Sequence, residues 1–324
     1  MINIEKLRAL IAREIEKMNF NSRHPQELYM PVDYIMSMGG KRLRPVLCLM
    51  ACRLFTDDIF DCLRPAVAIE LFHNFTLLHD DIMDKADMRR GRPTVHKKWG
   101  ENTAIISGDV MVVLSFDLIS SAKPDILPRL LSVFNRTAVE VCEGQQMDMN
   151  FETISRVDEN SYLEMIKLKT SVLIAASMEI GAIAAGASTK DSGLMYESGL
   201  NLGLAFQLQD DVMDLYGDQD KFGKKPGGDI LMNKKTILLI KAFETADEKT
   251  ANKITDIMEK EQDPETKISE IKNIFDQLDV KEAADRMTND YFQEALRKLN
   301  GASCNPERKK EFGEFIETVM NRKS

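Results

Sequence analysis

The segment LLHDDIMDKADMRRG, residues 77–91, closes a long apolar stretch with three aspartates and then a pair of arginines. Asp80 and Asp84 lie four positions apart, so on a helix their carboxylates share one face, whereas Asp81 points about 100° away. Like charges at this spacing weaken a helix by about 0.3 kcal/mol, and the macrodipole disfavours anions near a helix C-terminus. The segment therefore predicts a helix end that attracts Mg²⁺, which binds carboxylate oxygens and shares them with phosphates.

A second segment, QLQDDVMDLYGD at residues 207–218, repeats the pattern Asp-Asp-x-Met-Asp after another apolar helical stretch. One acidic cluster is more often solvated surface, but two matching clusters, starting at Asp80 and Asp210, favour a joint role. We expect two helices that face each other across a cavity, with Mg²⁺ ions linking both to a diphosphate. Arg89 and Arg90 would complete the phosphate site, because guanidinium groups bind phosphate through two hydrogen bonds.

The apolar pattern has a period near 3.6 residues almost throughout, and no stretch alternates convincingly like a strand. We find no linker that divides the chain, so we expect one all-α domain over residues 1–324. Pro65 and Pro306 suit first turns, and Gly91-Arg92-Pro93 suits a helix break. The predicted helices cover residues 2–18, 26–38, 43–55, 65–87, 102–121, 126–149, 160–186, 192–215, 234–246, 249–261, 264–298 and 306–322.

Composition narrows the class of protein. The chain has 324 residues and a net charge of −9, which argues against a nucleic-acid partner. Basic residues gather locally, at 41–44, 89–92 and 221–235, as suits a small anion. Five cysteines without metal-binding spacing indicate reduced thiols and a cytoplasmic protein. The N-terminus lacks a signal peptide, and Glu179 interrupts the stretch VLIAASMEIGAIAAG, so we expect no transmembrane segment.

Together these motifs resemble the trans-isoprenyl diphosphate synthase family, the polyprenyl synthetases. The resemblance implies an all-α bundle around a central cavity, a homodimer, and head-to-tail condensation of isopentenyl diphosphate with dimethylallyl, geranyl or farnesyl diphosphate. The motifs occur in family order between about residues 36 and 240: GGKRLRP (39–45), LLHDDIMDKADMRRG (77–91), GQQMD (144–148), KT (169–170), QLQDDVMD (207–214) and GKKPGGDILMNKKT (223–236).

The resemblance also implies residue roles. Two of about three Mg²⁺ ions would be held by Asp80 and Asp84, and the third by Asp210. Asp81 and Asp214 complete the motifs, and Asp211 belongs to the same catalytic set. The allylic site would contain Arg89, Gln145, Asp148, Lys169, Lys224 and Lys234. The isopentenyl diphosphate pocket would contain Lys41, Arg44, His73 and Arg90, and Thr170 and Gln207 would lie beside the reacting carbons.

The chemistry agrees with these roles, because ionising an allylic C–O bond requires the leaving diphosphate to be neutralised. No nucleophilic triad stands out in the sequence. A class I terpene cyclase is the second hypothesis, disfavoured by the intact DDVMD and by Lys41 and Arg44. A non-catalytic partner subunit is the third, disfavoured because the motifs keep their aspartates and arginines.

Product length should depend on the side chains below the first aspartate. Thr76 and Phe72 lie one and two helical turns below Asp80, about 6 Å and about 12 Å away. Phe75 occupies the family's position for a chain-stopping aromatic, although ideal geometry turns it about 140° from Asp80. We predict a product of fifteen or twenty carbons. The motif lacks the two-residue insertion of many bacterial farnesyl synthases, which favours geranylgeranyl diphosphate, with farnesyl diphosphate as the alternative.

Overall fold

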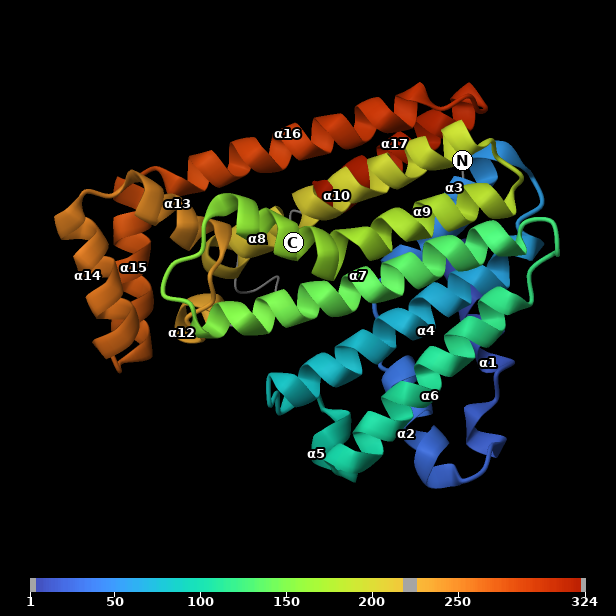
Figure 1. Ribbon diagram of the computed structural model, residues 1–324, viewed down its shortest axis with the longest axis horizontal. Helices are drawn as coiled ribbons and strands as arrows, with labels where there is room; N and C mark the ends of the chain where they lie inside the picture. The colour runs from blue at the N-terminus through green and yellow to red at the C-terminus, as the bar shows by residue number, and fades with distance from the viewer. Residues whose placement is uncertain (1–3, 218–225, 322–324) are drawn as a thin grey trace. The chain divides into compact units, whose positions relative to one another are not determined.

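The computed structural model describes residues 4–217 and 226–321. Apart from one short strand pair it is built of helices and their connections (Figure 1), so the all-α prediction is confirmed. The elements are α1 (Ile4–Glu16), η1 (Phe20–Ser22), α2 (Gln26–Ser37), α3 (Leu43–Phe55), α4 (Phe60–Met83), β1 (Met88–Arg89), β2 (Arg92–Pro93), α5 (Val95–Trp99), α6 (Glu101–Ser120), α7 (Leu127–Thr153), α8 (Glu159–Ile166), η2 (Lys167–Ser171), α9 (Val172–Ala184), α10 (Thr189–Tyr216), α12 (Gly228–Leu231), α13 (Ile237–Thr245), α14 (Glu248–Lys260), α15 (Pro264–Gln277), α16 (Val280–Gly301) and α17 (Pro306–Met320).

The described helices form two compact units. The first contains residues 1–135, 176–196 and 302–312. Its centre is the 24-residue helix α4, which packs against α6 and α3. Helix α3 is buried along most of its length, because its sequence LRPVLCLMACRLF is apolar on every side. Burial of this kind supplies most of the stabilisation of a helical core. The packing of α3 against α4 therefore fixes α4, which carries the first aspartate motif.

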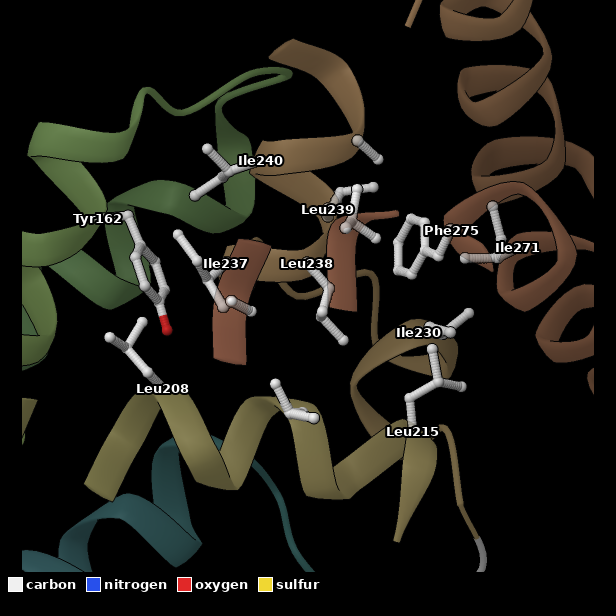
Figure 2. Packing of buried hydrophobic residues seen from close by; sticks show 14 of the residues in the cluster. Tyr162, Leu208, Leu215, Ile230, Ile237, Leu238, Leu239, Ile240, Ile271 and Phe275 are labelled. Carbon is white, nitrogen blue, oxygen red and sulfur yellow. The ribbon is translucent and has the colours of Figure 1, made fainter. Parts of the chain in front are cut away.

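The second unit contains residues 136–175, 197–301 and 313–324. Its core gathers apolar residues from α8, α10, α13 and α15. Figure 2 shows Tyr162 of α8 beside Ile237 of α13, with Leu208 of α10 below them. These three residues are almost fully buried. The core therefore holds the stretch of α10 that carries the second aspartate motif.

Several predicted boundaries are wrong. The predicted helix over 264–298 is two helices, because Asp279 adopts a left-handed φ of +52° between α15 and α16. Short polar side chains tolerate that conformation, but a helix does not continue through it. Helix α4 begins at Phe60, where Asp58 Oδ1 accepts the backbone N–H at 3.0 Å, so Pro65 lies inside the helix rather than in its first turn.

A strand pair follows α4 where the sequence pattern indicated none. Met88–Arg89 and Arg92–Pro93 pair antiparallel around a tight turn at Arg90 and Gly91, which have φ values of +50° and +73°. Helix α4 consequently ends at Met83, before the predicted residue 87. The chain reverses there, and this reversal brings Arg89 back to Asp81 of α4.

Helix α6 is long and apolar enough to cross a membrane by length and composition alone, which is weak evidence for a transmembrane segment. The core helix of a soluble protein passes the same test. About 39% of its most apolar window is buried inside the structure. The feature therefore defines an apolar helix with a partly exposed face.

Candidate active site

The first aspartate motif lies at the end of α4. Asp81 is only 2% exposed, and Arg89 Nε donates to its two carboxylate oxygens at 2.9 and 2.8 Å. Asp80 is half-buried in the last helical turn, and Asp84, directly after the helix, is exposed. The strand pair thus uses one arginine to neutralise the buried aspartate, and leaves Asp84 facing solvent. Sequence reasoning had assigned Arg89 to phosphate binding only.

Basic groups of the predicted isopentenyl diphosphate pocket meet in this unit. Arg44 Nη1 lies 3.1 Å from His73 Nε2, and Arg90 donates from Nη1 to the carbonyl of Gly39. Gly40 has a φ of +123°, and an added Cβ would lie 2.9 Å from the Arg90 guanidinium carbon. A side chain at Gly40 would therefore be strained by this φ and would displace the Arg90 guanidinium. Lys41, the remaining predicted residue, has an exposed side chain.

The electrostatics of this cluster of basic residues keep His73 neutral. Burial lowers the pKa of His73 well below 6.5, and the neighbouring guanidinium groups, Arg44 first and then Arg90, lower it further. A neutral imidazole accepts a hydrogen bond from Arg44 without adding repulsion. The cluster is therefore strongly positive yet hydrogen-bonded, which is the arrangement that a polyanion such as diphosphate requires.

In the second unit, the KT motif lies on a π-helical turn, η2 (Lys167–Ser171). Such turns occur frequently at functional sites. Lys169 Nζ donates to Asp148 Oδ2 at 2.5 Å, and Thr170 Oγ1 donates to Gln207 Oε1 at 3.1 Å. Four residues predicted for the reaction site thus meet in two pairs.

Two glycines allow the neighbouring helices to approach this π turn. A Cβ on Gly144 of α7 would lie 2.2 Å from the Lys169 nitrogen, and one on Gly203 of α10 would lie 2.5 Å from Ser171 Cα. Neither position has room for a side chain, since real Cβ contacts are longer than about 3 Å. Gly144 is the first residue of the predicted GQQMD motif, and its lack of a side chain lets α7 approach the backbone of the π turn. Gln145 and Asp148 follow it on the same helix.

Asp211 is buried in the second motif and binds three donors. They are the Tyr162 hydroxyl, Gln207 Nε2 at 3.1 Å and the Ile237 backbone N–H at 3.1 Å. Burial raises the pKa of Asp211 to about 6, against the effect of these hydrogen bonds, and the charge of Asp210 adds to the rise. Asp211 therefore orients Gln207 and the start of α13. The sequence analysis missed Tyr162, whose signal was a tyrosine in a predicted helix, because a buried phenol hydroxyl usually finds a hydrogen-bond partner.

Asp214 of α10 accepts hydrogen bonds from the backbone at the start of α12. Its Oδ2 accepts the Asp229 backbone N–H at 3.0 Å, and its carbonyl accepts the Gly227 N–H at 2.7 Å. The Lys234 backbone N–H donates to the Asp229 carbonyl at 2.9 Å, and the Lys234 side chain is exposed. Asp214 thus connects α10 to the segment that carries Lys234. Lys224 lies outside the described residues.

The donor chemistry of the predicted metal ligands fits Mg²⁺. Within residues 4–217 and 226–321, no three His, Cys, Asp or Glu side chains form a group that could hold a metal ion alone. Mg²⁺ is usually held by one or two carboxylates, several waters and substrate phosphates. Asp80, Asp84 and Asp210 supply such carboxylates, and none of them is fully buried.

Two of the three predicted chain-length residues, Phe72 and Phe75, belong to a row of aromatic rings. The ring centroids of Phe72 and Phe75 are 5.4 Å apart, and Phe72 packs on Phe134 at 5.4 Å. Phe75 contacts the His79 ring at 4.7 Å on its other side. Phe72 is 2% exposed, whereas Phe75 is half-buried. The Thr76 hydroxyl donates to the His73 carbonyl at 2.8 Å. Phe75 is therefore the accessible ring, and Phe72 supports it from behind.

Comparison with known proteins identifies the family. The polyprenyl synthetase family model matches residues 25–277. The geranylgeranyl diphosphate synthase of Methanosarcina mazei is 44% identical over 222 residues, which are 68% of this chain and 68% of that protein. The geranylfarnesyl diphosphate synthase of Natronomonas pharaonis is 39% identical over 236 residues, 67% of this chain and 69% of that protein. A crystal structure of a geranylgeranyl pyrophosphate synthase is 44% identical, with a TM-score of 0.94 and complete coverage of both chains.

The chain therefore belongs to the polyprenyl synthetase family and is an isoprenyl diphosphate synthase, a trans-prenyltransferase. The family and the all-α fold predicted from the motifs are confirmed.

Proposed function

We propose that this enzyme condenses isopentenyl diphosphate with an allylic diphosphate in the presence of Mg²⁺ and releases geranylgeranyl diphosphate and pyrophosphate. The main support is the pocket of Arg44, His73 and Arg90, because it is built to hold a diphosphate and a terpene cyclase would not need it. Several similar proteins carry the name geranylgeranyl diphosphate synthase.

The residues of the chain act by binding and orienting charge. Bound Mg²⁺ ions would neutralise the leaving diphosphate, with Asp80, Asp84 and Asp210 as their ligands. Arg44 and Arg90 hold the diphosphate of the second substrate, while His73 stays neutral between them. Lys169 and Asp148, and Thr170 and Gln207, position the allylic carbons as two hydrogen-bonded pairs. Preorganised donors of this kind stabilise the charge that develops as the C–O bond breaks.

Product analysis tests this proposal. The purified chain receives Mg²⁺, labelled isopentenyl diphosphate, and one primer at a time: dimethylallyl, geranyl or farnesyl diphosphate. We expect chain extension with each primer, and a main product of twenty carbons. A main product of fifteen carbons would favour the farnesyl alternative. Cyclic hydrocarbons formed without isopentenyl diphosphate would identify a terpene cyclase, and no turnover of any kind would favour a partner subunit.

The half-buried ring of Phe75 sets the product length in this proposal. Phe75→Ala removes the accessible ring and leaves Phe72 in place, so we expect products one or two isoprene units longer. Phe116→Leu is the matched control. Phe116 belongs to the same aromatic row but is separated from Phe75 by Phe72 and Phe134, so its replacement should leave product length unchanged. Chromatography of dephosphorylated products measures both. An unchanged distribution in Phe75→Ala would contradict the assignment.

We further propose a homodimer whose interface includes α6. Its exposed side includes Ile105, Ile106 and Val113, with 42%, 57% and 65% of their surfaces accessible. Exposed apolar groups gathered on one helix are typical of interaction surfaces. Light scattering after size exclusion should give about twice the 36.8 kDa mass of the chain. A monomer at micromolar concentration would refute this.

Two further predictions belong to the proposal. We propose that residues 1–324 work as one catalytic domain, since the motifs that carry the reaction are distributed over both compact units. We also propose a cytoplasmic location, with the five free cysteines as support.

A further inference from the structure

Glu70 is a buried carboxylate on the helix that carries His73. It is 2% exposed and lies three positions before His73 on α4. Burying a carboxylate is costly unless it is paired and hydrogen-bonded. Glu70 meets both conditions, because Oε1 accepts Arg42 Nη1 at 2.5 Å and Asn74 Nδ2 at 3.0 Å. Its position on α4 is therefore fixed from two sides.

Arg42 connects Glu70 to a second element. Its other terminal nitrogen, Nη2, donates to the Met36 carbonyl near the end of α2 at 2.5 Å. The side chain is only 14% exposed. One guanidinium thus joins α2, α4 and the loop that contains Lys41. The planar fork of arginine permits this double contact, whereas lysine carries a single ammonium group.

The backbone of Arg42 is strained in a way that requires this anchor. Arg42 has φ +48° and ψ +40°, the left-handed region, and is the residue that precedes α3. Non-glycine residues persist in that region only where their surroundings hold them. The left-handed residue sets the direction of the chain between Lys41 and Arg44. If the side chain of Arg42 were released, the loop could relax and both neighbouring cations would move.

We infer that Arg42 and Glu70 are positioning residues for the diphosphate pocket. The inference rests on the proposed function, since the pocket formed by Arg44, His73 and Arg90 is the one assigned to isopentenyl diphosphate. Glu70 holds Arg42 away from the substrate and ties the Lys41–Arg44 loop to the same helix that presents His73. The pair therefore sets the spacing between the two sides of the pocket without touching the substrate.

The test compares the Michaelis constants of the two substrates. Glu70→Gln keeps the size of the side chain but removes the charge that holds Arg42, and Arg42→Lys keeps the charge but loses the fork. Each should raise KM for isopentenyl diphosphate about tenfold, as loss of a group that orients a ligand typically does. KM for the allylic substrate should change less than about twofold, because that substrate does not use this loop.

Arg308 offers a matched control in the same unit. Its guanidinium also joins a carboxylate and a carbonyl, Asp57 Oδ1 at 2.5 Å and the Arg53 carbonyl at 2.9 Å. These contacts lie at the far end of α3, about 18 Å along a helix of 13 residues. Arg308→Lys should leave both Michaelis constants unchanged.

The outcomes separate the two proposals. An equal rise of both constants in the Glu70 and Arg42 variants, or no rise in either constant, would overturn the positioning role. Lack of prenyl transfer by the unmodified chain would instead refute the proposed function. If Glu70→Gln does not fold, Arg42→Lys decides alone, because it leaves a cation beside the buried carboxylate.

Discussion

The two Asp-Asp-x-Met-Asp motifs have the same pattern but end their helices differently. Helix α4 ends at Met83, so Asp84 lies beyond it and is exposed, whereas α10 continues to Tyr216 and holds Asp214 inside it. The middle aspartates differ more. Asp81 is paired with the Arg89 guanidinium, whereas Asp211 is bound by neutral donors.

The difference shows that one sequence pattern can stabilise its buried aspartate in two different ways. In the first motif, a cation cancels the buried carboxylate. In the second, burial prevails and raises the pKa of Asp211 to about 6. The first and second aspartates of each motif also divide the work, since the middle residue is buried and engaged while Asp80 and Asp210 remain partly accessible. The same motif therefore places a buried carboxylate at the same helical position, and the residues packed around that carboxylate determine how its charge is stabilised.

The largest expected effect tests whether the two motifs serve one leaving group. Asp80→Ala and Asp210→Ala should each lower kcat by at least about a thousandfold, because each removes a proposed ligand of the Mg²⁺ ions that would neutralise the diphosphate. The double variant should lose little more than either single one, as groups that act as a unit are not additive. Steady-state kinetics with a labelled substrate measures all three. Undiminished turnover in the double variant would refute the joint role.

A smaller effect should separate the two middle aspartates. Arg89→Ala leaves Asp81 buried without its cation and should lower the free energy of unfolding by about 3 kcal/mol. Tyr162→Phe removes one neutral hydrogen bond from Asp211 and should cost about 1 kcal/mol. Urea denaturation measures both.

The control is the double variant Arg89→Ala with Asp81→Asn, which removes the unpaired charge and should recover part of the stability. Equal losses in Arg89→Ala and Tyr162→Phe would contradict the electrostatic contrast between the motifs.

The sequence predicted much of this arrangement, because helix period and motif order are local features. The all-α fold falls within that prediction, and the contacts of Arg44 with His73 and of Thr170 with Gln207 join residues that the prediction had grouped. Phe72 and Phe75, both named as chain-length residues, are in contact, although ideal helix geometry turned Phe75 away from the face of Asp80.

The remaining features depend on long-range packing. Arg89 reaches Asp81 only because the chain reverses in a pair of two-residue strands, for which the sequence indicated only a helix break at Gly91-Arg92-Pro93. The π turn has no propensity of its own, and the glycines packed on it, Gly144 and Gly203, lie 23 and 32 residues away from it in the chain. The break at Asp279 depends on one left-handed residue inside a continuous amphipathic pattern. Periodicity averages over such single positions.

Gly203 provides a mid-sized test confined to the second region. In Gly203→Ala the new methyl would lie 2.5 Å from Ser171 Cα, so α10 and the π turn must separate. We expect a loss of about 2 kcal/mol in the free energy of unfolding, as overpacking commonly costs. Turnover should fall as well, because Thr170 and Gln207 move apart.

Gly313→Ala is the matched helical control, since a Cβ there meets nothing within 4 Å. It should be neutral or stabilising by up to about 1 kcal/mol, because alanine favours helix more than glycine does. Equal stability of the two alanine variants would contradict the close approach at Gly203.

The smallest expected effect concerns the charge of the first region. The pKa of His73 is lowered well below 6.5 by burial and by Arg44. Below about pH 6.5 the unfolded chain therefore binds a proton at this histidine, whereas the folded protein does not. Above about pH 6.5 His73 is neutral in both states and does not affect the free energy of unfolding. As the pH decreases below about 6.5 toward the folded pKa of His73, the free energy of unfolding falls. Between pH 6.5 and pH 5.5 the loss due to this group should be about 1 kcal/mol. His73→Gln should lose that much less than the unmodified chain over the same interval, as measured by urea denaturation at each pH. Identical pH profiles for the two proteins would mean that the arginine cluster does not exclude the proton, and the contrast with Asp211, which is bound by neutral donors, would no longer hold.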